Sequence, residues 1–217
     1  MGDYMKPSES SQTPRQELYL LADRIRAIAD AGLTFSRDEY DLERYRELQG
    51  ISGTLAGAVD RLGDQPDTQI HDPRPHHLSP LCGVDAVVMR DDRMLLLKRP
   101  DSGKWAMPGG LLEVGETPAE GCVRELEEET RVVGRATRLL GVFDSRLWGY
   151  RLQFQLLSFV FAVEHVAGEP VPTDEALEVD YFAADELPPL SFGHEERVPL
   201  AFRLLREVGG GPHFDPA

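Results

Sequence analysis

Residues 109–132 of the 217-residue chain read GGLLEVGETPAEGCVRELEEETRV, and this segment combines a glycine pair, a helix start and a cluster of acids. Thr117 and Glu120 have the spacing of a helix capping box, and Pro118 falls at the first helical position, where its missing N–H costs nothing. The sequence therefore predicts a helix over residues 117–130.

The predicted helix has an apolar face and an acidic face. The apolar residues recur at spacings of three and four: Ala119, Cys122, Val123 and Leu126. The acidic face consists of Glu125, Glu128 and Glu129, and two of these lie in the last turn, where the helix dipole disfavours acids. Such a face is either solvated surface or a site for a hard cation such as Mg²⁺, which prefers oxygen ligands.

The residues before the helix favour the metal site. Gly109 and Gly110 allow backbone carbonyls to approach a ligand closely. Glu116 precedes the helix and Arg124 lies two turns inside it, so this pair can anchor the loop to the helix. Loop, helix and acids together predict one preorganised scaffold.

This segment resembles the Nudix box, a family motif written G-x5-E-x7-R-E-U-x-E-E-x-G-U, in which U is an aliphatic residue. Eight positions match over 23 residues: Gly110, Glu116, Arg124, Glu125, Leu126, Glu128, Glu129 and Val132. Arg131 stands where the family has glycine, which serves the turn that ends the helix. The departure puts the geometry of that turn in question and leaves every acid in place.

The resemblance implies an α/β fold, the Nudix α/β/α sandwich around a mixed sheet, and an enzyme that hydrolyses a pyrophosphate bond. By resemblance, Mg²⁺ or Mn²⁺ would be bound by Glu125, Glu128, Glu129 and the backbone carbonyl of Gly109. Glu116 and Arg124 would be the structural pair of this catalytic segment. The metal ions would neutralise the pyrophosphate oxygens and position the attacking water.

A carboxylate must also accept the proton of the attacking water. Glu129 is one candidate. Several Nudix enzymes instead use a glutamate in a loop near the last strand, where this sequence has Glu175 and Glu178; Glu178, just before the apolar run at Val179, is preferred. Arg99 is a candidate phosphate contact. Glu175, Glu178 and Arg99 are equally well explained as exposed surface charges.

The whole chain divides into four parts by its pattern. We expect a disordered tail over residues 1–14, a helical N-terminal domain over 15–65, a proline-rich linker over 66–80 and the Nudix hydrolase domain over 81–217. The first of two N-terminal helices is expected to end at Gly32. Because a small helical hairpin cannot bury a core alone, it must pack on the rest of the chain or on a second copy.

Five segments outside the box resemble CDP-choline pyrophosphatase and its relatives that act on X-linked nucleoside diphosphates. These are residues 24–29, 32–35, 41–45, 140–144 and 182–190. The resemblance implies a homodimer and a CDP-choline-like or ADP-ribose-like substrate, cleaved into a nucleoside monophosphate and a phosphorylated X group.

Other readings stay open. Tyr150 lies 18 residues past the box, where diadenosine polyphosphate hydrolases carry a tyrosine, and Trp148 stands where ADP-ribose pyrophosphatases typically have a proline. Trp148 and Tyr150 are candidates for stacking on a base, although aromatic residues near a strand more often belong to the core. A nucleoside triphosphate pyrophosphohydrolase and a non-catalytic Nudix-fold protein that binds nucleotides are further alternatives.

The composition bounds the partners and the compartment. With 38 acidic and 23 basic side chains and a net charge of −15, the surface disfavours long nucleic acid. The apolar runs are too short to span a bilayer, the first residues lack the pattern of a secretory signal, and only two cysteines are present. We therefore expect a cytoplasmic protein with a small nucleotide substrate and no membrane partner.

Overall fold

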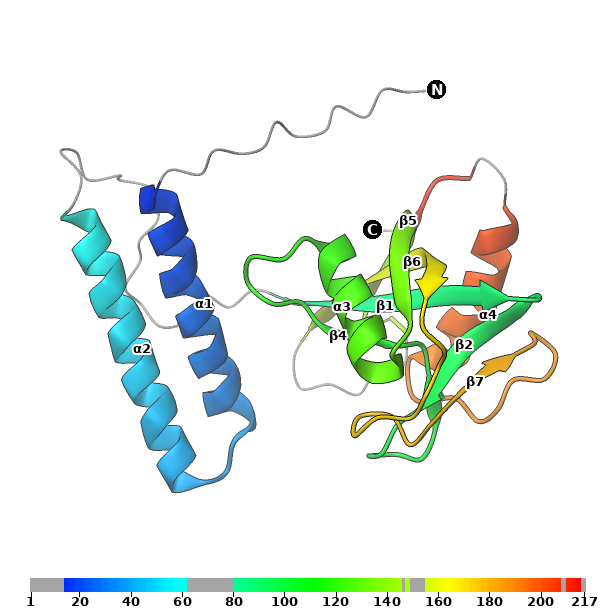
Figure 1. Cartoon of the computed structure of the whole chain (residues 1–217), viewed down its shortest axis with the longest axis horizontal. Coiled ribbons are helices and arrows are strands. Elements are labelled where there is room, and N and C mark those ends of the chain that lie inside the picture. Colours follow the sequence, from blue (N-terminus) through cyan, green and yellow to red (C-terminus); the bar gives the residue numbers. More distant parts are fainter. Residues whose placement is uncertain (1–13, 62–79, 146, 149–154, 208–209, 216–217) are drawn as a thin grey trace. The chain divides into compact units, whose positions relative to one another are not determined.

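The computed structural model describes residues 14–61, 80–145, 147–148, 155–207 and 210–215, which divide into two compact units (Figure 1). The predicted tail over residues 1–14 and linker over residues 66–80 lie outside the described residues, apart from Pro14 and Pro80. The boundaries of the four parts therefore stay a prediction. No helix in the described ranges is both long enough and apolar enough to cross a bilayer. The cytoplasmic location also stays a prediction.

The first unit contains a helical hairpin. Helix α1 covers Pro14–Phe35 and helix α2 covers Glu39–Asp60. Asp38 caps α2, because its carboxylate accepts the backbone N–H groups of Tyr40 and Asp41.

Gly32 does not end α1, contrary to the expectation from the sequence. The helix continues to Phe35, and the glycine serves the contact between the two helices instead. A Cβ atom at Gly32 would lie 2.3 Å from the ring of Tyr45 in α2, so a larger residue would collide with that ring.

The second unit is built on a mixed sheet (Figure 1). Its strands are β1 (Leu81–Arg90), β2 (Arg93–Lys98), β3 (Trp105–Ala106), β4 (Gly109–Leu111), β5 (Val133–Asp144), β6 (Leu156–Ala167), β7 (Glu178–Phe182) and β8 (His213–Phe214). Their order is β3-β2-β1-β6-β5-β8, with β4 paired to β1 and β7 paired to β2. The β1–β6 and β5–β8 pairs are parallel, and the other pairs are antiparallel.

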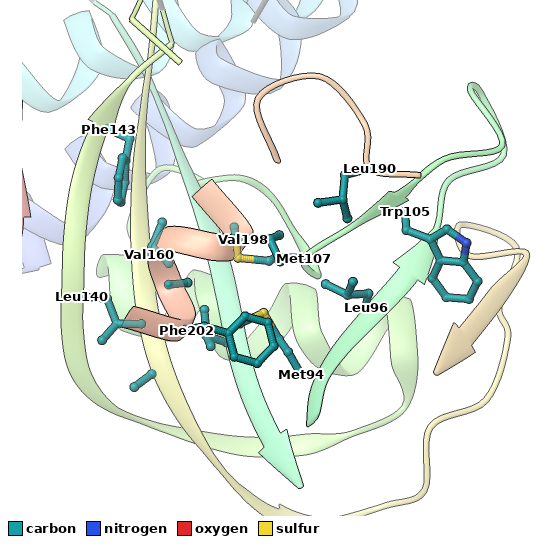
Figure 2. Packing of buried hydrophobic residues seen from close by; sticks show 13 residues of the cluster. Met94, Leu96, Trp105, Met107, Leu140, Phe143, Val160, Leu190, Val198 and Phe202 are labelled. Carbon is teal, nitrogen blue, oxygen red and sulfur yellow. The ribbon is translucent and has the colours of Figure 1, made fainter. Parts of the chain in front are cut away.

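Two helices cover opposite faces of this sheet. Because successive strand residues point to opposite faces, Leu95 of β2 packs in one apolar cluster while its neighbours pack in the other. Helix α3 (Pro118–Thr130) contributes Leu126 to the Leu95 cluster. Helix α4 (His194–Arg206) contributes Phe202 to the second cluster (Figure 2). The predicted α/β/α sandwich around a mixed sheet, preceded by a helical hairpin, is confirmed.

Both ends of α3 follow from local chemistry. The predicted capping box is present, because Thr117 Oγ1 accepts the N–H of Glu120 at 3.3 Å and Glu120 accepts the N–H of Thr117 at 2.8 Å. At the other end Arg131 adopts the left-handed conformation, with φ 63°, and its N–H bonds to the carbonyl of Glu127 at 2.8 Å. Arg131 thus keeps the turn that the family forms with glycine, at a steric cost of about 1 kcal/mol.

Replacing Arg131 with glycine is expected to raise the free energy of unfolding of the second unit by about 1 kcal/mol, because glycine adopts this φ without a Cβ clash. Urea unfolding followed by the fluorescence of Trp105 and Trp148, which lie in this unit, measures the change. Arg203→Gly is the matched control, since Arg203 is exposed inside α4, where glycine should cost about 1 kcal/mol. A loss of stability in the Arg131→Gly protein would contradict this account of the turn.

Candidate active site

Arg124 holds the acidic face of α3 together. Its Nε and Nη2 atoms donate to the two carboxylate oxygens of Glu116 at 2.7 and 3.0 Å, and Nη1 donates to Glu125 at 2.8 Å and to Glu128 at 3.0 Å. The bond to Glu116, followed by those to the other acids, raises the pKa of Arg124 above its ordinary value. The pair that anchors the loop to the helix is therefore present, and the same guanidinium also holds two of the three acids.

Glu129 lies at the buried end of the acidic face. The residue is 7% exposed, and its Oε2 atom accepts the N–H of Gly109 at 2.7 Å. Burial raises the pKa of Glu129 to about 8, against the opposing effect of the Gly109 N–H. Burial also raises the pKa of Glu125, against its bond with Arg124. Carboxylates held where their charge is disfavoured are stabilised by a cation, so these residues fit a bound divalent ion.

Gly109 and Gly110 allow close approach of β4 to its surroundings. A Cβ atom at Gly109 would lie 2.0 Å from the carbonyl oxygen of Val84, and one at Gly110 would lie 2.6 Å from the carboxylate of Glu125. The two glycines therefore bring the backbone of β4 directly against β1 and the acidic face.

The metal ligands Glu125, Glu128, Glu129 and the Gly109 carbonyl stay a prediction. Within the part of the chain that the structure describes, no three acidic, histidine or cysteine side chains converge closely enough to hold one ion. Arg124 accounts for this arrangement, because it draws Glu125 and Glu128 into ion pairs. The donor types nevertheless suit Mg²⁺, which keeps several waters and needs only one or two carboxylates beside a phosphate.

Glu175 lies in a loop fastened to the end of α3. Thr173 Oγ1 donates to the backbone carbonyl of Glu129 at 3.1 Å and accepts the N–H of Glu175 at 3.2 Å. Burial is the largest cause of the raised pKa of Glu125 and of Glu129. The negative charge of Glu175 is a smaller cause that raises both pKa values further. Glu175 is thus held within electrostatic range of the acidic face.

Glu178 makes its contacts on the sheet. It is the first residue of β7 and pairs across strands with Lys98, whose Nζ atom lies 2.6 Å from Glu178 Oε1. Its side chain is 58% exposed. These contacts do not test which glutamate is the general base, so Glu178 and Glu175 both stay predictions.

A cavity of about 400 Å³ opens beside the two glycines of β4. Its wall includes Arg99 and Lys104, two cationic side chains, and the half-exposed ring of Phe192. Arg99 donates from Nε and Nη2 to Asp101 at 3.1 and 2.8 Å, and Lys104 Nζ lies 4.9 Å from the centre of the Phe192 ring. The cavity has the size of a small-molecule site, and its cations suit phosphate oxygens.

Trp148 and Tyr150, the two aromatic residues expected to bind substrate, stay predictions. Trp148 donates from its indole N–H to Asp215 at 2.7 Å and packs edge-on against Phe143 of the core, and it is not in the wall of the cavity. Tyr150 lies outside the described residues. Phe192, which the sequence does not single out, is the aromatic ring that lines this cavity.

Asp85, His194 and Arg197 form a buried polar network at the wall of the same cavity. Arg197 Nη1 donates to Asp85 Oδ2 at 2.6 Å, and the N–H of Met107 donates to His194 Nδ1 at 3.3 Å. Burial, together with the positive charge of Arg197, lowers the pKa of His194 to about 3, so its ring is neutral. Asp85, a lone acid within an apolar strand, is a signal for this network in the sequence.

The chain belongs to the Nudix family. The sequence profile of the NUDIX domain matches residues 80–202, which include the loop, α3 and the cavity wall. A second profile, described as a UDP-X-like, N-terminal oligomerisation domain, matches residues 16–70. The chain is therefore a Nudix pyrophosphohydrolase with an N-terminal domain of a type associated with self-association.

Several relatives cover much of the chain. YjhB of Bacillus subtilis, named as a proposed ADP-ribose pyrophosphatase, is 34% identical over 197 residues, which are 89% of this chain and 95% of that protein. The ADP-ribose pyrophosphatase of Methanocaldococcus jannaschii is 38% identical over 125 residues, or 56% of this chain and 73% of that protein. The crystal structure of a UDP-X diphosphatase matches with a TM-score of 0.64 and 30% identity, covering 93% of this chain and 99% of that one.

Gly110→Ala is expected to weaken Mn²⁺ binding by about tenfold or more, because the added methyl group occupies the position of the Glu125 carboxylate. The glutamate side chain can rotate away, so the fold should tolerate the change. Isothermal titration with Mn²⁺ measures the effect. Gly53→Ala is the matched control, since no atom lies within 4 Å of its added methyl group. Equal Mn²⁺ affinity in the two variants would contradict a metal site at Glu125.

Proposed function

We propose that this Nudix pyrophosphohydrolase cleaves a nucleoside diphosphate linked to another group X and releases a nucleoside monophosphate and a phosphorylated X group. The observation that carries the proposal is the cavity of about 400 Å³ whose wall includes Gly109 and Gly110. These two glycines lie against Glu129 and Glu125 of the acidic face. Relatives named for ADP-ribose and UDP-X hydrolysis support the same substrate class. Within this class an ADP-ribose-like substrate is supported by relatives named for it, and the CDP-choline-like choice rests on the five outer segments.

The described residues divide the work of binding. Arg99 and Lys104 contact phosphate oxygens at the cavity wall, and the ring of Phe192 offers a surface for stacking a base. A Mg²⁺ or Mn²⁺ ion bound by the acidic face and the Gly109 carbonyl would supply charge neutralisation at the pyrophosphate. Arg124 keeps Glu116 as its partner and so preserves the loop while the acids bind the ion.

Glu175 is the better candidate for the general base. Its loop is fixed to the backbone of Glu129 through Thr173, so its carboxylate is held near the acidic face. Glu178 accepts a hydrogen bond from Lys98 on the sheet, and Glu129 accepts one from the N–H of Gly109. A base must lie within reach of the attacking water, and the loop position of Glu175 favours it.

The N-terminal domain supports a homodimer. Its profile match is to an oligomerisation domain, and its two helices expose large hydrophobic residues. These are Leu21, Ile28, Phe35, Tyr40 and Ile51. Exposed apolar surface of this extent commonly marks an interaction site, and a second copy of the chain fits it.

A substrate panel tests the proposed function. It contains ADP-ribose, CDP-choline, a UDP-sugar, diadenosine polyphosphates and nucleoside triphosphates with Mg²⁺ or Mn²⁺, followed by phosphatase-coupled phosphate release. We expect release from one or more X-linked diphosphates only when the phosphatase is present, since both products are monoesters. Glu129→Gln is isosteric and should abolish release, because it removes a ligand charge. Preference for dinucleoside polyphosphates or triphosphates, or no hydrolysis at all, would contradict the proposal.

Glu175→Gln is expected to lower kcat by about 10²- to 10⁴-fold, because the amide cannot accept the proton of the attacking water. Glu178→Gln is the matched control and should retain most of the activity, since its side chain is exposed and paired with Lys98. Steady-state kinetics with the best substrate of the panel compares the two. A larger loss of kcat in the Glu178→Gln protein would assign the base to Glu178 instead.

A further inference from the structure

The buried network of Asp85, His194 and Arg197 has no part in the proposed chemistry, although two of its members line the cavity. Arg197 is 1% exposed, and Asp85 and His194 are each 5% exposed. A buried ion pair seldom stabilises a fold more than well-packed apolar residues would, because desolvation offsets its attraction. Its place in the cavity wall therefore indicates a role other than stability.

His194 is connected to the metal site through three consecutive backbone residues. Its Nδ1 atom accepts the N–H of Met107 at 3.3 Å. The carbonyl of Pro108 accepts the N–H of Ala86 at 2.8 Å, and the N–H of Gly109 donates to Glu129 at 2.7 Å. Segment 107–109 is thus held in turn by α4, by β1 and by α3.

Arg197 fixes the first turn of α4 against β1. Its Nη1 atom donates to Asp85, and its Nε atom donates to the carbonyl of Gly193 at 2.7 Å. Asp85 is the pairing partner of Gly109 between β1 and β4. A Cβ atom at Gly109 would lie 2.0 Å from the carbonyl of Val84, so the backbones of β1 and β4 approach each other closely here. The pairing of Asp85 with Gly109 gives a direct route by which a displacement of Asp85 would reach Gly109.

We infer that Asp85, Arg197 and His194 are positioning residues, which fix segment 107–109 and thereby hold the Gly109 carbonyl and the Glu129 carboxylate ready to bind a divalent ion. They act through the backbone of Met107 and of β1. The inference rests on the proposed function, because it takes the Gly109 carbonyl as a metal ligand.

His194→Asn and His194→Leu form a matched pair that tests this inference. Asparagine and leucine have nearly the same shape, but only asparagine can accept the N–H of Met107 in place of the imidazole. Isothermal titration with Mn²⁺ in the absence of nucleotide gives the metal affinity, and amide hydrogen exchange reports on Met107. We expect His194→Leu to weaken Mn²⁺ binding by about tenfold and to speed exchange at Met107, with His194→Asn close to the wild type in both.

Phe202→Leu controls for general damage to α4, since Phe202 is buried in the same helix. It should lower the melting temperature and leave Mn²⁺ affinity unchanged. If His194→Leu does not fold, Arg197→Lys takes its place, because lysine keeps the charge but loses the bridge between Asp85 and the Gly193 carbonyl. Wild-type Mn²⁺ affinity in the tested variant, or an equal loss in Phe202→Leu, would overturn the inference.

The titration also separates this inference from the proposed function. A silent substrate panel, combined with a clear difference in Mn²⁺ affinity between the His194 variants, would overturn the substrate class alone. Hydrolysis of X-linked diphosphates with no difference between the variants would overturn the positioning role alone. A wild-type protein that binds no Mn²⁺ would overturn both.

Discussion

The arrangement of the site depends on the ion pairs that Arg124 makes with three glutamates. Acids three and four residues apart on a helix repel one another, and two of these acids lie at the negative end of the helix dipole. Arg124 offsets that repulsion by bonding Glu125 and Glu128, and it ties the preceding loop to α3 through Glu116. Arg124 thus holds both the loop before α3 and two of the three acids.

Glu129 adds a second constraint that Arg124 does not relieve. It is buried, bonded to the N–H of Gly109, and its pKa is raised to about 8 by loss of solvent. The protein therefore keeps a carboxylate in a place that favours protonation unless a positive charge arrives. Thr173 bonds the carbonyl of the same residue and places the Glu175 loop beside it. One helix end thus organises a metal ligand candidate and a general base candidate together.

The parts of this site that could be predicted from the sequence are those that depend on the spacing of residues close together in the chain. The capping box at Thr117 and the shared face of the three glutamates depend on residues a few positions apart, and the α/β/α sandwich follows once the box is recognised. Arg131 is an exception to the local preference for glycine at a left-handed helix end, because an arginine adopts that conformation here.

The remainder depends on contacts between distant segments. Arg197 and Asp85 are 112 positions apart, and Thr173 and Glu129 are 44 positions apart. No local sequence pattern therefore predicts either hydrogen bond. Gly32 looks like a helix end in the sequence because its packing against Tyr45 appears only when α2 folds back on α1. The bond from the indole N–H of Trp148 to Asp215 likewise joins residues 67 positions apart.

The central claim is that the acidic face of α3 and the Gly109 carbonyl bind the divalent ion that the reaction needs. Anomalous diffraction from crystals grown with Mn²⁺ tests it most directly. We expect Mn²⁺ bound by Glu129, the Gly109 carbonyl and one or both of Glu125 and Glu128, with those acids released from Arg124 while Glu116 stays paired to it. Mn²⁺ bound at another place, or an acidic face still fully paired with Arg124 at saturating Mn²⁺, would contradict the account.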